Sequence, residues 1–291
     1  MRRFLPGFGL ISVLLLAGCV PGADGIDGDL NDEWPAMRAA ETFVPQAETC
    51  HSTVGSTVQS KSYSPVACAQ KHFVETLHVG QLTGPIADLA APPEFSDAAM
   101  EPAYAECDKG VNARLGRNWR DYQFDLIMRL PTLVAWQGGA RWVRCDVVVP
   151  RDLARTDDDD LVEQIAPLRG AALEDVLLGC FDYKSAPGAS LTEVGCTKPH
   201  NAEYVGSTSM PSGTKYPDAD AEWDKLHDKC FALAAAFVGV TESALTTGVS
   251  SWVESQDRWN GGDRSIRCYL WLDKKTMSSS AKDSKGQGIP K

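Results

Sequence analysis

The decapeptide WQGGARWVRC, Trp136–Cys145, recurs as WNGGDRSIRC, Trp259–Cys268, and the two segments share six of their ten residues without a gap. The same offset aligns Cys107 with Cys230, so 39 residues run in one register. Upstream, the block Val66–Glu75 matches its later counterpart at Val, Cys, His and Glu. These matches predict that the chain contains two tandem copies of one domain.

Eight of the nine cysteines follow the same duplication. The first four are separated by 18, 39 and 38 residues, and the last four by 16, 34 and 38. We therefore expect one repeat over residues 47–150 and a second over residues 176–273. The two sets are Cys50, Cys68, Cys107 and Cys145, and Cys180, Cys196, Cys230 and Cys268.

A duplication reduces the disulfide alternatives. Eight cysteines allow 105 pairings, but a pattern repeated within each copy leaves three. The identical 38-residue gap favours Cys107 with Cys145 and Cys230 with Cys268. The remaining cysteines of each copy would then close a shorter loop.

Hydrophobic periodicity predicts an α+β fold with short antiparallel strands and one main helix in each copy. Apolar residues recur at helical spacing over 96–116 and between Asp218 and Gly239. Alternating apolar residues predict strands at Val143–Val149 and Ile266–Leu272, each with an inward-facing cysteine. The segments between the first two cysteines of each copy indicate hairpins.

The N-terminus predicts export. Two arginines precede an apolar run that is too short for an ordinary membrane span, so residues 1–18 are typical of a signal peptide. The run ends in Leu16–Cys19, which resembles the lipobox of bacterial lipoproteins. We expect Cys19 to carry acyl chains that insert in the lipid bilayer. The mature protein would lie at the outer face of the cytoplasmic membrane, where disulfides form.

Composition excludes some partners and marks some segments as unstructured. Without residues 1–18, 26 basic and 39 acidic side chains give a formal charge of −13, which argues against nucleic acid. We expect a flexible tether over 19–46, a linker over 151–175 and a disordered tail over 274–291. The aspartate run Asp157–Asp160 lacks the turn glycines of a calcium loop, so we interpret it as solvated.

The pattern Cys-x-x-x-His-x-x-Glu occurs twice and is the main candidate site. A reactive cysteine needs a neighbouring imidazole, and a metal needs several such donors. Oxidation of the cysteines would leave only His and Glu, which favours structural hydrogen bonds over a metal or hydrolytic site. The candidates are His72, Glu75, His200 and Glu203. His51, His78 and His227 do not recur at matching positions, so we expect them at the surface.

Arginine and tryptophan flank the Gly-Gly pair in both copies. Arg141 and Arg264 could grip a carboxylate or phosphate, with Trp136 and Trp259 stacking on a ligand. The alternative that we favour is a tryptophan in the core and an arginine paired to Glu75 or Glu203. The sequence has no catalytic motif that proposes an enzyme, and none that implies a cofactor.

The second copy resembles the septum formation domain of actinobacteria. The residues that carry the resemblance are Cys180, Val194, Cys196, Pro199, His200, Glu203, Cys230, Trp259, Gly261, Arg264 and Cys268. The first copy departs from the pattern at Lys71, where the second has Pro199. The resemblance implies an extracytoplasmic, membrane-associated domain with a part in septation. We therefore expect a non-catalytic envelope lipoprotein that binds a cell-wall component or a division protein.

Overall fold

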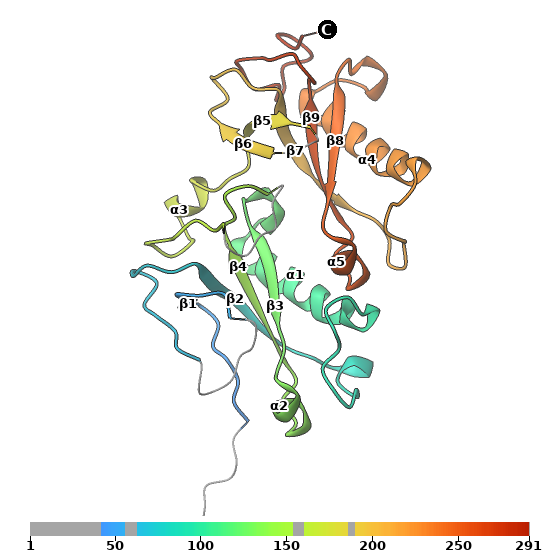
Figure 1. Ribbon diagram of the computed structural model, residues 1–291. Helices are drawn as coiled ribbons and strands as arrows, with labels where there is room; N and C mark the ends of the chain where they lie inside the picture. Colours follow the sequence, from blue (N-terminus) through green and yellow to red (C-terminus); the bar gives the residue numbers. More distant parts are fainter. Residues whose placement is uncertain (1–41, 56–62, 154–159, 186–189, 291) are drawn as a thin grey trace, which may run out of the picture. The chain divides into compact units, whose positions relative to one another are not determined.

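The computed structural model describes residues 42–55, 63–153, 160–185 and 190–290, which belong to one compact unit beginning at Thr42. This part of the chain forms two antiparallel sheets, each packed against one long helix (Figure 1). The predicted mixed fold of helices and antiparallel strands is therefore confirmed. The predicted signal peptide, Cys19, most of the tether and Asp157–Asp159 lie outside the described residues.

The first sheet has the strand order β1-β2-β4-β3 and packs against helix α1, Glu101–Leu115. All seven residues of β4 are buried, because α1 covers one face of the sheet and Phe43 and Tyr63 cover part of the other. Cys145 points toward the helix, as the alternation predicts. The strands are β1 (Thr49–His51), β2 (Val74–Gln81), β3 (Asp125–Arg129) and β4 (Trp142–Val148).

The second sheet has the order β6-β5-β7-β9-β8 and packs against α4, Asp220–Val238. Gly239 ends α4 in the left-handed conformation, with φ +80°, as expected of a C-terminal glycine. The helix begins after Ala219 rather than Asp218, and the Glu222 carboxylate accepts both of their N–H groups. The strands are β5 (Cys180–Lys184), β6 (Ser190–Val194), β7 (Ala202–Ser209), β8 (Gly248–Val253) and β9 (Ser265–Trp271).

Short helices precede the last strand of each sheet. Helix α2, Leu133–Gln137, precedes β4, and α5, Gln256–Asn260, precedes β9. Each buries its tryptophan, and each ends at the first glycine of the Gly-Gly pair. A further short helix, α3, spans Ala171–Glu174. These single-turn helices have no periodicity that a sequence window can detect.

The four disulfides are those that the cysteine spacing favours. Two of them join the long helix to the last strand, and their four cysteines are fully buried. The other two close loops of 18 and 16 residues. Strands β5 and β6 pair antiparallel, as expected of the predicted hairpin, whereas β1 pairs with β2 and meets Val66 only in an isolated bridge.

The predicted disordered tail is wrong for residues 274–290. Met277, Ala281 and Ile289 are buried in a cluster with the end of α4 and with β9. The Lys285 N–H donates to the Val238 carbonyl oxygen over 2.8 Å, so the segment also completes the helix terminus. Three anchors scattered among Lys, Ser and Gly form no periodic pattern, which explains the incorrect prediction.

The predicted linker is also structured over residues 160–175. Leu168 is buried in the core of the first sheet, and Gln164 exchanges two backbone hydrogen bonds with His72. The end of the predicted tether packs too, because the Phe43 carbonyl accepts the indole N–H of Trp142 over 2.9 Å. Residues 160–175 and the end of the predicted tether therefore pack against the first sheet and are part of its folded domain.

Candidate functional site

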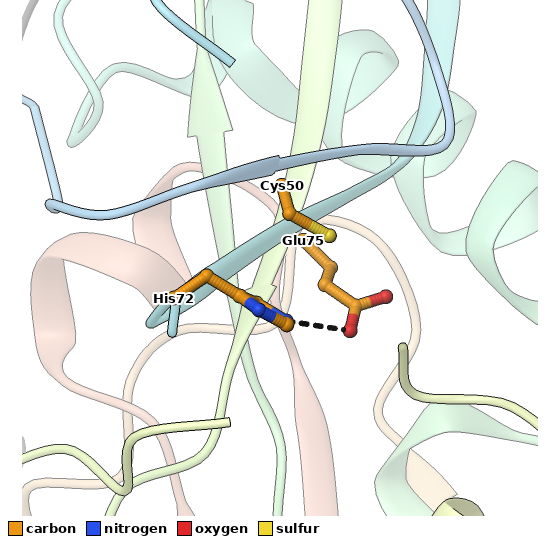
Figure 2. Close-up of side chains that lie close together, drawn as sticks. All are labelled: Cys50, His72 and Glu75. Atoms are coloured by element: carbon orange, nitrogen blue, oxygen red, sulfur yellow. Dashed lines mark hydrogen bonds and ion pairs between the residues drawn. The ribbon is translucent and has the colours of Figure 1, made fainter. Parts of the chain in front are cut away.

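His72 and Glu75 form a buried pair beside the first disulfide (Figure 2). His72 Nδ1 lies 2.7 Å from the Gln70 carbonyl oxygen, and Nε2 lies 3.0 Å from Glu75 Oε1. The same carboxylate oxygen accepts the N–H of Leu168 over 2.7 Å. The pair therefore fixes the segment after β4 against β2.

His200 and Glu203 occupy the matching positions beside the third disulfide, but they do not bond to each other. Glu203 accepts the N–H of Ala281 over 2.7 Å and the hydroxyl of Ser280. His200 Nδ1 lies 2.7 Å from the Lys198 carbonyl oxygen, whereas its buried Nε2 has no hydrogen-bond partner. In both places the glutamate accepts a backbone N–H from a segment that lies far away in the sequence.

Within the described part of the chain, two groups of side chains have donor atoms close enough to share a metal ion. Cys50, His72 and Glu75 form the first group, within 4.8 Å of one another, and Glu203 lies as close to the sulfurs of the third disulfide. A cysteine binds a metal or acts as a nucleophile only as a thiolate, and these sulfurs are in disulfides. Without the sulfur, each group retains at most two of the donors that such a site requires.

The repeated tryptophans are core residues. Trp136 and Trp259 are 1 % and 0 % exposed, and their indole N–H groups donate to the carbonyl oxygens of Leu89 and Thr214 over 2.7 and 2.8 Å. Each tryptophan thereby holds a loop that lies far away in the sequence. Neither ring is available to stack on a ligand.

The predicted pairing of the arginines with Glu75 or Glu203 is wrong. Arg141 stacks on Trp136, with 4.2 Å from its guanidinium carbon to the ring centre, and donates to carbonyl oxygens that include that of Ala87. Arg264 lies 3.3 Å from Glu101 of α1. The glutamates face the other end of the long strands, so the arginines cannot reach them.

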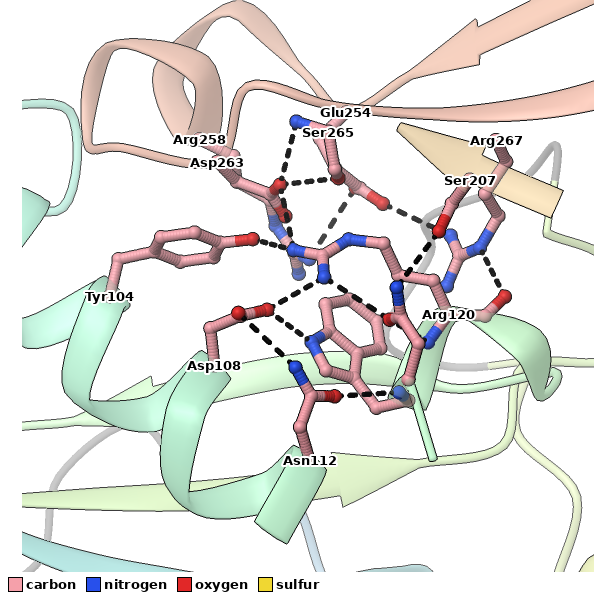
Figure 3. Close-up of polar contacts among 12 residues, drawn as sticks. Tyr104, Asp108, Asn112, Arg120, Ser207, Glu254, Arg258, Asp263, Ser265 and Arg267 are labelled. Atoms are coloured by element: carbon pink, nitrogen blue, oxygen red, sulfur yellow. Dashed lines mark hydrogen bonds and ion pairs between the residues drawn. The ribbon is translucent and has the colours of Figure 1, made fainter. Parts of the chain in front are cut away.

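A network of ion pairs joins residues of the two sequence halves and was not predicted (Figure 3). Arg258 of α5 forms a bidentate ion pair with Asp125 of β3. Arg120 lies 2.6 Å from Asp108 and 3.4 Å from Asp263, and Arg267 donates to the Phe124 carbonyl oxygen over 2.7 Å. We call this set, with Glu254, the junction network. Its directly bonded members lie up to 147 residues apart, so no local motif reveals it.

Burial shapes the ionisation of the junction network. Burial raises the pKa of Asp108, an effect opposed by the hydrogen bond from Trp119. Burial likewise raises the pKa of Glu254, and Asp125 adds to the shift. Burial alone would lower the pKa of Arg258, but the carboxylates of Asp125 and Glu254 outweigh it and raise the pKa. The network is therefore a partly dehydrated set of paired charges.

A cavity of about 480 Å³ opens beside the junction network. Residues from α1, the end of β7 and the start of β9 line it, and most of them are polar or charged. Its size lies within the range of small-ligand sites. Arg264, Arg120 and Asp108 are at its wall, so Arg264 is the one predicted site residue that lines it.

A second polar cluster is specific to the first sheet. His51 Nε2 lies 3.3 Å from the Thr76 hydroxyl, which donates to Asp146 over 2.7 Å. His51 is 8 % exposed, so its predicted surface position is wrong. The second sheet has the aromatic cluster Phe181, Tyr204 and Tyr269 at the matching strand positions.

Comparisons with known proteins relate the chain to one family. A family model described as septum formation matches residues 47–268, which include all four disulfides and both sheets except the last three residues of β9. Neither the curated proteins nor the solved structures contain a match. Among the described residues, no helix combines the length and apolar character that a membrane span requires.

Proposed function

This chain belongs to the septum formation family, and we propose that it serves septation as a lipid-anchored, non-catalytic binding module at the outer face of the cytoplasmic membrane. The apolar run before Cys19 supports export, and the lipobox-like segment supports acylation at Cys19. The resemblance to the actinobacterial domain supports an actinobacterial envelope as its location. Its partner there would be a cell-wall component or a division protein.

The four disulfides are the observation that carries the proposal. Disulfides persist in oxidising compartments and are rare in the cytosol. By loop entropy each contributes about 3 to 4 kcal/mol, a large share of the stability of a small domain. They also remove the eight bonded cysteine thiols from catalysis, and the neighbouring glutamates cap backbone groups.

We further propose that the two sheets are tandem copies of one domain. Support comes from the matching disulfides, of which the second and fourth each span 38 residues. The pairing of β2 with β4 and of β7 with β9 shifts register at corresponding places, between Thr76 and His78 and between Tyr204 and Gly206. Matched irregularities of this kind are typical of common ancestry within a chain.

A test of the anchor uses Cys19→Ala in the full-length chain. The unchanged protein should partition into detergent and sediment with membranes, whereas the variant should lack acylation, as judged by mass spectrometry. Depletion of the protein should then delay or misplace septa, and the Cys19→Ala variant should fail to restore them. Soluble, unacylated native protein, or normal septa after complete depletion, would contradict the proposal.

A further inference from the structure

The end of β7 has a free edge that faces the polar cavity. In the residues that the structure describes, β5 pairs with β7 only at Cys180–Phe181, opposite Glu203 and Ala202. Beyond that point no strand covers the β5 side of Ser207–Ser209, which line the cavity together with α1. The edge of a strand and the side of a helix therefore border one hollow.

The direction of the backbone groups follows from the pairing with β9. The Met210 N–H donates to the Arg264 carbonyl oxygen over 2.9 Å, on the β9 side. In an antiparallel ladder, alternate residues direct both backbone groups to the same neighbour. Thr208 therefore bonds toward β9, while the N–H and C=O groups of Ser207 and Ser209 point away from it, to the free edge.

Free backbone donors and acceptors at a strand edge suit one kind of ligand. An extended peptide adds to such an edge as a further strand, and its backbone supplies the hydrogen bonds. Ser207–Ser209 is about 10 Å long, enough for about three added residues.

Charge at the cavity selects among peptides. The carboxylates of Glu101 and Asp108 on α1 are 35 % and 31 % exposed. Arg120 and Arg264, which are 6 % and 8 % exposed, are the ion-pair partners of Asp108 and Glu101, so the carboxylate is the more exposed member of each pair. A ligand thus meets accessible negative charge, and the chain as a whole carries a formal charge of −11. Lysine or arginine side chains in the peptide would complement both.

We propose that the groove between α1 and the free edge of β7 binds an extended, basic peptide segment of a partner protein by strand addition. The inference rests on the binding role proposed above and names the class of partner. The junction network forms part of the floor of this groove, because Arg120 belongs to both. Binding would therefore add contacts to residues of both sequence halves.

The test is a titration of the folded, disulfide-bonded protein with two synthetic peptides of equal length, acetylated KVKVK amide and acetylated EVEVE amide. The basic peptide should bind and should protect the amides of Ser207 and Ser209 from solvent exchange in NMR spectra. The acidic peptide should bind at least about tenfold more weakly at low salt. Added salt should reduce the difference, because exposed charges are screened.

Ser209→Pro and Ser209→Ala form a matched pair of variants. Proline removes the outward N–H without breaking a bond to β9 and is tolerated at strand edges, whereas alanine keeps the N–H. Proline should weaken binding of the basic peptide at least about tenfold, and alanine should leave it within about twofold. Unfolding curves will test whether both variants are folded. If the proline variant is unfolded, the protection of the Ser207 and Ser209 amides in the unchanged protein tests the proposal instead.

Equal binding of both peptides, no binding, or protection of amides elsewhere would overturn the proposal. Displacement of the basic peptide from this groove by an N-acetylglucosamine oligomer, with tighter sugar binding, would also overturn it by identifying a glycan site. None of these outcomes touches the proposed envelope function, which depends on Cys19 and septation. If the native protein proved to be unacylated but still bound the basic peptide, only the proposed lipid anchor at Cys19 would be refuted.

Discussion

Gly261 provides a sharp test of the junction between residues of the two sequence halves. Gly261 follows α5, and a Cβ added there would lie far inside the van der Waals distance of the Phe95 carbonyl oxygen. The matching Gly138 follows α2, and its nearest neighbours are carbonyl oxygens of its own helix at 3.4 Å, an ordinary contact. Gly261→Ala and Gly138→Ala are therefore the same change in two environments.

The backbone contribution cancels in this comparison. Gly261 has φ −73° and ψ 0°, and Gly138 has φ −78° and ψ 3°, so alanine fits both conformations. At such sites Gly→Ala stabilises by about 0.4–1 kcal/mol through the unfolded chain. At Gly261 the clash with backbone opposes this gain, and overpacking typically costs about 1–3 kcal/mol. Gly138→Ala should be neutral or stabilising, and the Gly261 variant should be about 1–3 kcal/mol less stable than it.

The assay is guanidinium unfolding followed by tryptophan fluorescence, since Trp136 and Trp259 are buried. Hydrogen exchange locates the effect, because the Gly261 variant should lose protection near Phe95 and the start of α1. Equal stability of the two variants within about 0.5 kcal/mol would refute the docking of residues 256–262 against Phe95. Lost protection confined to α5 would refute it as well.

The remaining predictions concern the two sheets. Replacing Cys107 and Cys145 together by alanine should lower the free energy of unfolding by about 3.9 kcal/mol through the lost 38-residue loop, and further through lost packing. The same change at Cys50 and Cys68 should lower it by about 3.2 kcal/mol. If chemical unfolding gave the reverse order, the result would be inconsistent with the buried bridge. Burial, and secondly the charge of Arg144, lower the pKa of His51 below 6.5, and Asp146 opposes this shift only in part. The unfolded state therefore binds more protons at this residue than the folded state does, so His51 reduces the stability of the fold as the pH falls below about 6.5. His51→Phe should flatten that loss in unfolding midpoints measured between pH 7 and 5, and an unchanged slope would exclude His51 as its source. Glu203→Ala should expose the Ala281 amide to exchange at a local cost of about 1–3 kcal/mol, and retained protection would contradict the capping role.

Local patterns predicted the elements that rest on local physics. The helix that ends at Gly239 follows from apolar spacing and from the need for a left-handed residue there. The last strand of each sheet follows from alternation, and the pairing of Cys107 with Cys145 follows from the 38-residue gap that also separates Cys230 from Cys268. The short helices and the strands β3 and β8 were not predicted, because a single turn or a strand of five or six residues carries too few apolar positions to form a recognisable pattern.

The candidate site was predicted only in part. His72 and Glu75 meet as expected of a hydrogen-bonded pair, whereas His200 and Glu203 bond to other groups. Arg264 was chosen for its place beside a Gly-Gly pair, yet its partner Glu101 lies 163 positions away. The partner of a long side chain depends on which residues the tertiary fold brings close to it, and no fixed spacing in the sequence encodes that partner.

The sequence by itself determined the four disulfides, the mixed fold and the membership of residues 47–268 in the septum formation family, because these depend on spacing, periodicity and residue identity. Only the tertiary structure decided that residues 160–175 and 274–290 complete the two cores, that the junction network exists, and that the edge of β7 faces a cavity. The physical reason is that burial and ion pairing depend on distance in space, which segments far apart in the chain reach only when it folds.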